Sequence, residues 1–149
     1  MYILALNCGS SSLKYQVFDA NTKQSILGGN VEKIGLPDSF VSLKLSNGTK
    51  QTIKYPMKNH NDALKAVMNM LGDASIAKSD IGGVGHRVVM GGDKFASSVE
   101  INPYVIKTLN ELAPLAPLHN PSGVSGIVTA QQLLPNAKQV AVFDTAFHQ

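Results

Sequence analysis

The sequence predicts an α/β domain, in which β-strands and amphipathic helices follow one another along a chain of 149 residues. Three observations lead to this fold class. Segments that favour β-structure dominate residues 1–55. After Asn61 the apolar residues recur at helical spacing. Two further β-branched segments, 83–89 and 139–143, are separated by helical patterns, and this order of elements is typical of α/β folds.

Two hairpins are predicted in the first part of the chain. Residues 2–6 and 13–18 are β-prone and flank a Gly/Ser turn, so we expect an antiparallel pair with a polar loop at its tip. Residues 40–45 and 51–55 both alternate apolar and polar side chains, and an Asn-Gly pair at 47–48 is a strong turn signal. The second hairpin is expected to be half exposed.

A helix is predicted from Asn61 onward, with Asn61 or Asp62 as its N-terminal cap and Gly72 as its stop. Met68 and Met70 are interpreted as core residues of this helix rather than as part of a cofactor site. The apolar face consists of Leu64, Val67, Met68 and Leu71.

The second half of the chain contains a strand, two helices and a strand. Residues 83–89 are interpreted as a buried strand, although Arg87 lies inside it. A helix is expected to begin at Asn102-Pro103 and to end before Pro114. Another helix is predicted at 122–134, followed by the strand 139–143.

Composition excludes several classes of function. The net charge of +3 is modest and the lysines are scattered, which argues against nucleic acid as a partner. No apolar run approaches the ~20 residues that cross a bilayer, and residues 1–6 resemble a strand rather than a signal peptide. Cys8 is the single cysteine, so an intrachain disulfide is excluded. We therefore expect a soluble cytoplasmic domain.

The segment from Asn7 to Lys14, Asn-Cys-Gly-Ser-Ser-Ser-Leu-Lys, has a composition suited to phosphate. Backbone N–H groups and small hydroxyl side chains can converge on an anion in such a loop. The loop lacks the spacing of a P-loop and leads into a strand instead of a helix. On composition alone, an ordinary Ser/Gly hairpin turn remains the alternative.

Arg87 and Asp144 are the charged residues whose positions point to chemistry. The planar fork of a guanidinium fits a carboxylate or a phosphoryl group, and the alternative for Arg87 is a structural ion pair with Asp93 or Glu100. Asp144 follows the last predicted strand, where it could orient magnesium or the attacking group. The alternative for Asp144 is a turn or cap aspartate.

The histidines give a weaker signal. His86 and His119 could each be a ligand, a proton carrier or a hydrogen-bonded buried imidazole, and the last is usually the commonest. No triad or metal-site spacing links them. His60 is expected at the surface.

The order of residues in the Asn7–Lys14 loop closely resembles the first phosphate loop of acetate and propionate kinases. These enzymes belong to the superfamily of actin, Hsp70 and sugar kinases, most of whose members have aspartate at the position of Asn7. Three further segments, 85–92, 114–121 and 142–149, resemble the same family in the same order. Met90 departs from the pattern, because family members usually have histidine there.

The resemblance implies an actin-like ATPase fold of the ribonuclease H-like type, a mixed sheet with flanking helices. Residues 1–149 would be the N-terminal domain of such an enzyme, whose C-terminal domain, absent from this chain, supplies nucleotide-binding and dimerisation surfaces. We therefore expect the isolated chain to have no kinase turnover, whereas the full-length protein would be a homodimer.

The resemblance also implies an activity and roles for individual residues. The γ-phosphoryl group of ATP would be transferred reversibly to acetate or propionate, giving an acyl phosphate and ADP, with Mg²⁺ or Mn²⁺ as cofactor. Asp144, Arg87 and Asn7 would be catalytic, and Asn7 would also contact the metal through the phosphate site. ATP would be bound by Asn7, Ser10, Ser11, Ser12 and Lys14. The carboxylate would be bound by Arg87, Val89 and Leu118.

Two other functions share parts of this pattern. A non-catalytic module that binds a carboxylate or phosphate would keep the same site, whereas a sugar kinase is disfavoured by Asn7 and by the lack of a sugar-binding signature. Acetate, propionate and butyrate are all candidate acids, because one methylene changes discrimination in an apolar pocket by only ~1–3 kcal/mol.

Overall fold

The computed structural model describes residues 1–88, 98–100 and 120–143. The helix expected after Asn102 lies outside these residues, as do three of the candidate site residues, Val89, Leu118 and Asp144.

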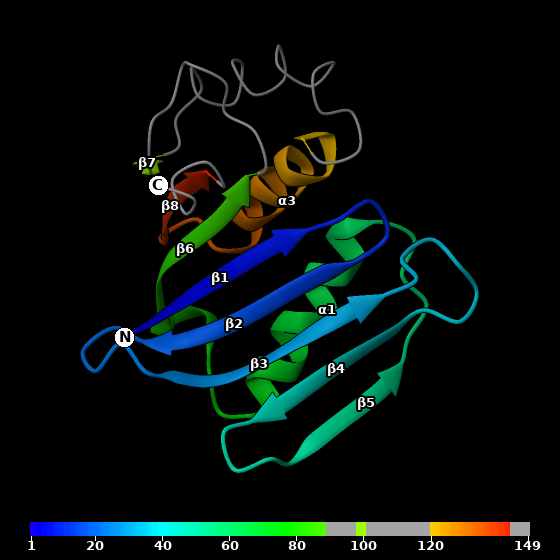
Figure 1. The fold of residues 1–149 in the computed structure, drawn as a ribbon, viewed down its shortest axis with the longest axis horizontal. Coiled ribbons are helices and arrows are strands. Elements are labelled where there is room, and N and C mark those ends of the chain that lie inside the picture. The colour runs from blue at the N-terminus through cyan, green and yellow to red at the C-terminus, as the bar shows by residue number, and fades with distance from the viewer. Residues whose placement is uncertain (89–97, 101–119, 144–149) are drawn as a thin grey trace.

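The described strands form one eight-stranded sheet with the order β5-β4-β3-β2-β1-β6-β8-β7 (Figure 1). β6 pairs in parallel with both β1 and β8, whereas the other neighbouring strands are antiparallel. The expected mixed sheet is therefore confirmed. The strands are β1 (Tyr2–Cys8), β2 (Leu13–Asp19), β3 (Ser25–Glu32), β4 (Phe40–Leu45), β5 (Lys50–Lys54), β6 (Ile81–Val88), β7 (Ser98–Glu100) and β8 (Lys138–Phe143).

Both predicted hairpins are confirmed. β1 and β2 are antiparallel over their whole length, from Tyr2 opposite Asp19 to Cys8 opposite Leu13. β4 and β5 are joined by a turn in which Gly48 has a φ of 93°, a backbone conformation that glycine adopts without strain. All five residues of β5 are exposed, because this strand forms an edge of the sheet.

The strand β3 was not predicted from the sequence. Its centre is Gly28-Gly29-Asn30, and these residues have low β-propensity. They are extended because β2 and β4 pair with β3 on both sides. The Tyr15 side chain of β2 lies across Gly29, and its hydroxyl donates to the Ser42 carbonyl of β4 at 2.7 Å.

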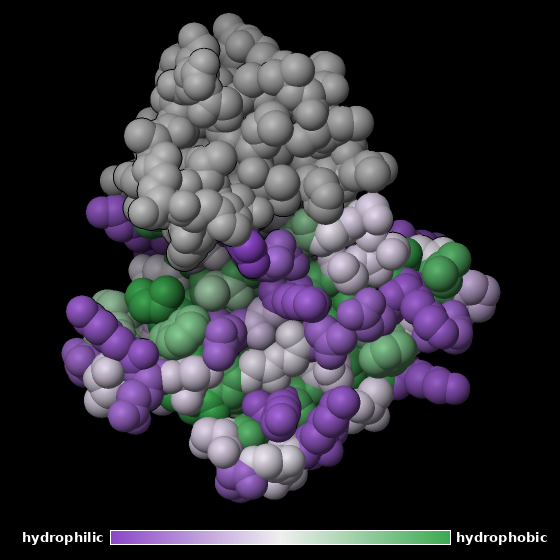
Figure 2. Space-filling view, in the orientation of Figure 1, coloured by the Kyte–Doolittle hydropathy of each residue, from purple (hydrophilic) through white to green (hydrophobic). Residues whose placement is uncertain are grey.

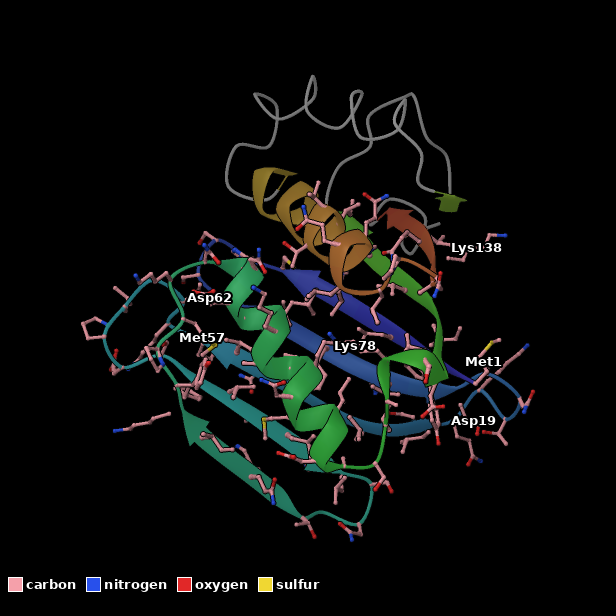
Figure 3. The ribbon with its side chains drawn as sticks, turned by 180° about the vertical axis from the view of Figure 1, so that it is seen from behind. Met1, Asp19, Met57, Asp62, Lys78 and Lys138 are labelled. Carbon is pink, nitrogen blue, oxygen red and sulfur yellow. The ribbon has the colours of Figure 1, made fainter. Side chains whose placement is uncertain are left out.

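The helices α1 (His60–Asp73) and α3 (Asn120–Leu133) cover one face of the sheet, as the view from behind shows (Figure 3). α1 begins earlier than predicted: its cap is Asn59, whose side chain accepts from the Asp62 N–H at 2.9 Å. Gly72 does not stop α1, because Ala74 is the C-terminal cap. A short 3₁₀ helix, Lys78–Asp80, leads into β6.

The core lies between this helical layer and the sheet. Every second residue of β1 and β2 points into it, as the alternating pattern predicts, and Leu4, Leu13 and Val17 are fully buried. Met68 and Met70 of α1 are 6% and 5% exposed, which confirms their interpretation as core residues. The residues of β1 and β2 that alternate with the buried ones lie on the opposite face, where apolar Ala5 stands beside the polar Asn7, Lys14 and Gln16.

Gly29→Ala is expected to destabilise the fold. A Cβ at this position would lie 2.6 Å from the Tyr15 hydroxyl and still closer to the Ser42 carbonyl, so the bond between β2 and β4 has to break or shift. Overpacking of this kind reduces the free energy of unfolding by roughly 1–3 kcal/mol. Urea unfolding of the 149-residue chain measures it.

Gly72→Ala is the matched control, because nothing lies within 4 Å of a Cβ placed there and the residue is helical. Alanine is the better helix former by up to about 1 kcal/mol, so this variant should unfold at the same or a higher urea concentration. Equal midpoints for the two variants would contradict the role assigned to Gly29.

Candidate active site

Three of the predicted site residues lie side by side on the face of the sheet opposite the helices. Asn7 of β1 pairs with Lys14 of β2. On the other side of β1 the parallel register pairs Leu6 with His86, so Arg87 of β6 is the next residue along, beside Asn7. Strands β2, β1 and β6 are neighbours in the sheet (Figure 1), and by this register they carry an ammonium, an amide and a guanidinium in a row.

These three side chains line a depression of about 270 Å³. Ala5 and Gly85, which are opposite each other in the β1–β6 register, contribute small residues to it. No acidic residue is among its described lining residues, whereas two cationic ones are. In Figure 2, which shows this face of the sheet, hydrophilic side chains are interspersed with apolar ones over the described strands. A depression lined by Lys14 and Arg87, with no acidic residue among its described lining residues, is suited to an anion.

The three serines occupy the loop between β1 and β2 and do not line this depression. Ser10 and Ser11 are exposed and Ser12 is half-buried. The loop is held by its backbone: the Gly9 N–H donates to the Ser12 carbonyl at 2.9 Å, and the Ile34 N–H donates to the Ser11 carbonyl at 2.9 Å. It therefore has more fixed contacts than a plain hairpin turn requires.

His60 makes a third contact to this loop, and its expected surface position is wrong. The side chain is 8% exposed, and its Nε2 lies 2.7 Å from the Gly9 carbonyl oxygen. A signal was present in the sequence, because His60, Leu64, Val67 and Leu71 share one helix face. With the cap expected at Asn61 or Asp62, His60 would lie outside the helix, whereas the observed cap at Asn59 places it in the first turn.

His86 is a hydrogen-bonded buried imidazole, the commonest of the three interpretations considered. It is 3% exposed, and its Nε2 lies 2.7 Å from the Gln139 side-chain oxygen. Burial lowers the pKa of His86 to about 4, so the ring is neutral near pH 7. In the alternating pattern of β6 it points to the face opposite that of Arg87.

Cys8 lies under α3 and has no access to the depression. Its side chain is 7% exposed, and its sulphur would be 2.7 Å from a Cβ on Gly126. Burial raises the pKa of Cys8 to about 12, so the thiol stays protonated and is a poor nucleophile. The cysteine in the loop sequence is therefore a packing residue.

The described residues offer oxygen ligands for a cation, but they form no complete metal-binding site. Within them, no group of three or more His, Cys, Asp or Glu side chains is placed to hold a metal ion. The amide of Asn7 and the exposed hydroxyls of Ser10 and Ser11 remain as hard oxygen ligands beside an anion-binding depression. This donor set fits a magnesium ion that is held mainly by the phosphates of a ligand.

A family model described as "Acetokinase family" matches residues 2–149. This chain belongs to the acetokinase family. Among curated relatives, the acetate kinases of Clostridium beijerinckii and Desulfitobacterium hafniense are 46% and 49% identical over 153 aligned positions. The alignments cover 100% of this chain and 38% of each relative, so the chain spans well under half the length of the acetokinases it matches.

Solved structures of the family share the fold. The Porphyromonas gingivalis acetate kinase superposes with a TM-score of 0.92 at 45% identity, covering 98% of this chain and 38% of that one. A propionate kinase from Francisella tularensis gives 0.90 at 38% identity, covering 99% and 38%. The expected acetokinase fold, an actin-like mixed sheet with flanking helices, is confirmed.

No helix among the described residues combines the length and the apolar character needed to span a membrane.

The buried His86 is expected to make stability depend on pH. The unfolded chain takes up this proton near pH 6.5 and the folded chain near pH 4, so the unfolded state binds more protons between these values. The free energy of unfolding should therefore have its full value above about pH 6.5. It should fall by up to roughly 3 kcal/mol as the pH is lowered towards 4.

Urea unfolding at a series of pH values measures this dependence, with His86→Gln as the comparison because glutamine does not titrate. The difference between wild type and variant should be constant above pH 7 and shrink between about pH 6.5 and 5. Parallel curves across that interval would show that His86 is not the group responsible.

Proposed function

We propose that the protein containing this chain is a carboxylate kinase. It transfers the γ-phosphoryl group of ATP to acetate or propionate, giving an acyl phosphate and ADP, and it also catalyses the reverse reaction. The observation that supports this most directly is the row of Lys14, Asn7 and Arg87 around one depression. Membership of the acetokinase family supports the choice of a carboxylate as acceptor.

The chemistry of such a transfer makes electrostatics the main task of the site. A carboxylate is already ionised at neutral pH, so the nucleophile needs no base. The difficulty is to hold two anions together while charge is spread over the equatorial oxygens of the phosphoryl group. Arg87 provides a planar fork of donors and Lys14 a point charge, on either side of Asn7.

ATP and a divalent ion, Mg²⁺ or Mn²⁺, complete the proposal. The loop residues Ser10, Ser11 and Ser12, with Asn7 and Lys14, would bind the phosphates, and the Asn7 amide oxygen and serine hydroxyls would contact the metal. The bound ion supplies neutralisation of phosphate charge. The Asn7 amide nitrogen can donate to a phosphate oxygen, and the amide oxygen can bind the metal ion, so Asn7 can contact either one.

Further residues of the proposed active site, and a proposed second domain, lie outside the part of the chain that the structure describes. Asp144 is proposed to be catalytic, and Val89 and Leu118 to contact the alkyl group of the acid beside Arg87. Residues 1–149 are proposed to be the N-terminal domain of a cytoplasmic homodimeric enzyme whose C-terminal domain binds the nucleotide. The isolated chain should then form no acyl phosphate by itself.

Arg87→Ala and Asp144→Ala in the full-length protein test the assignment. Acyl phosphate is trapped with hydroxylamine, and acetate, propionate and butyrate are compared. Each substitution should lower kcat/KM by roughly a hundredfold or more, because each removes a charged group that acts on the reacting atoms.

Lys65→Ala is the control, since Lys65 is an exposed residue of α1 on the other side of the sheet. It should leave kcat/KM unchanged. Activity within a few-fold of wild type in both site variants would refute the assignment, and a wild-type protein that forms no hydroxamate with any of the three acids would refute the proposed function.

A further inference from the structure

The loop between β1 and β2 has three of its four backbone carbonyls engaged in hydrogen bonds. The Ser12 carbonyl accepts from the Gly9 N–H within the loop, at 2.9 Å. The Ser11 carbonyl accepts from the Ile34 N–H, beyond the end of β3, at 2.9 Å. The Gly9 carbonyl accepts from His60, at 2.7 Å. Of these partners His60 is the only one that acts through its side chain.

Each of these bonds also fixes the direction of an N–H group. The carbonyl and the N–H of a trans peptide point to opposite sides of the chain, and no peptide bond in the described residues is cis. When the Gly9 carbonyl is turned towards His60, the Ser10 N–H is turned away from it. Among the described residues, the Ser10 N–H donates to no backbone carbonyl. It is therefore available to a ligand.

His60 is well placed to hold this peptide. It is the first residue of α1, is 8% exposed, and lies next to Asn59, whose side chain caps the helix. Because the carbonyl oxygen of Gly9 can only accept, Nε2 of His60 carries the hydrogen. Figure 3 shows the start of α1, near the labelled Asp62, at the same end of the sheet as the β1–β2 loop.

We propose that His60 is a positioning residue for phosphoryl transfer, which aims the Ser10 N–H at the phosphate group held by the Asn7–Lys14 loop. This inference rests on the proposed function. His60 touches no substrate; it acts through the Gly9–Ser10 peptide. The benefit is pre-organisation, since a donor already aimed at the phosphoryl oxygens needs no reorientation when charge develops on them.

Three substitutions in the full-length protein separate the hydrogen bond from packing. His60→Gln places an amide nitrogen near the position of Nε2 and should keep kcat within about threefold of wild type. His60→Leu fills similar space without a donor, and His60→Asn carries its donor too close to the backbone to reach Gly9. Both should lower kcat by roughly ten- to a hundredfold, while KM for the carboxylate changes less than about threefold.

Asn59→Ala is the matched control for helix stability. It removes the cap of α1, which lowers stability by about 1 kcal/mol, but leaves the imidazole contact to Gly9. Below its melting temperature this variant should keep wild-type kcat. If Asn59→Ala lost as much activity as His60→Leu, or if all His60 variants matched wild type, the positioning role would be wrong.

A binding measurement tests the inference without turnover. In full-length protein labelled with ¹⁵N-serine, inorganic phosphate should shift the Ser10 amide resonance of wild type and His60→Gln but not that of His60→Leu. Equal shifts in all three proteins would overturn the inference even if the enzyme proved to be a kinase. The stated pattern in a protein without kinase activity would support His60 and refute only the proposed function.

Discussion

The parallel pairing of β1 with β6 is the constraint on which the described site depends. The register that sets Leu6 opposite His86 also sets Asn7 beside Arg87, residues that are far apart in the sequence. A slip of one residue would turn Arg87 towards the helices and bring His86 to the outer face, because side chains alternate along a strand. Val84 of β6 is 1% exposed and would leave the core in such a slip, which disfavours it.

The same alternation separates two chemical environments across one sheet. On the helical face burial suppresses ionisation: it lowers the pKa of His86 to about 4 and raises that of Cys8 to about 12. On the opposite face Lys14 and Arg87 are exposed. Lys14 and Arg87 thus lie on the side where an anion can approach, whereas His86 and Cys8 remain neutral near pH 7.

The loop between β1 and β2, residues 9–12, lies where these strands end. Its side chains are exposed or half-buried, while the Ser11 carbonyl accepts from the Ile34 N–H, just after β3, and the Gly9 carbonyl from His60 of α1. The helical layer therefore supplies one of the hydrogen bonds that hold this loop. A helix without any residue lining the depression is thus joined to this loop by a hydrogen bond.

Local patterns in the sequence were sufficient for much of this protein. The hairpins and the core face of α1 follow from period and turn residues, motif order indicated the acetokinase family, and pairing across the hairpin brings Lys14 to Asn7. Tertiary structure decided the rest. Gly28-Gly29 became a strand because two neighbours pair with it, and His60 became a loop contact because α1 begins at the end of the sheet where β1 turns. Such contacts join residues distant in sequence, so no local pattern records them.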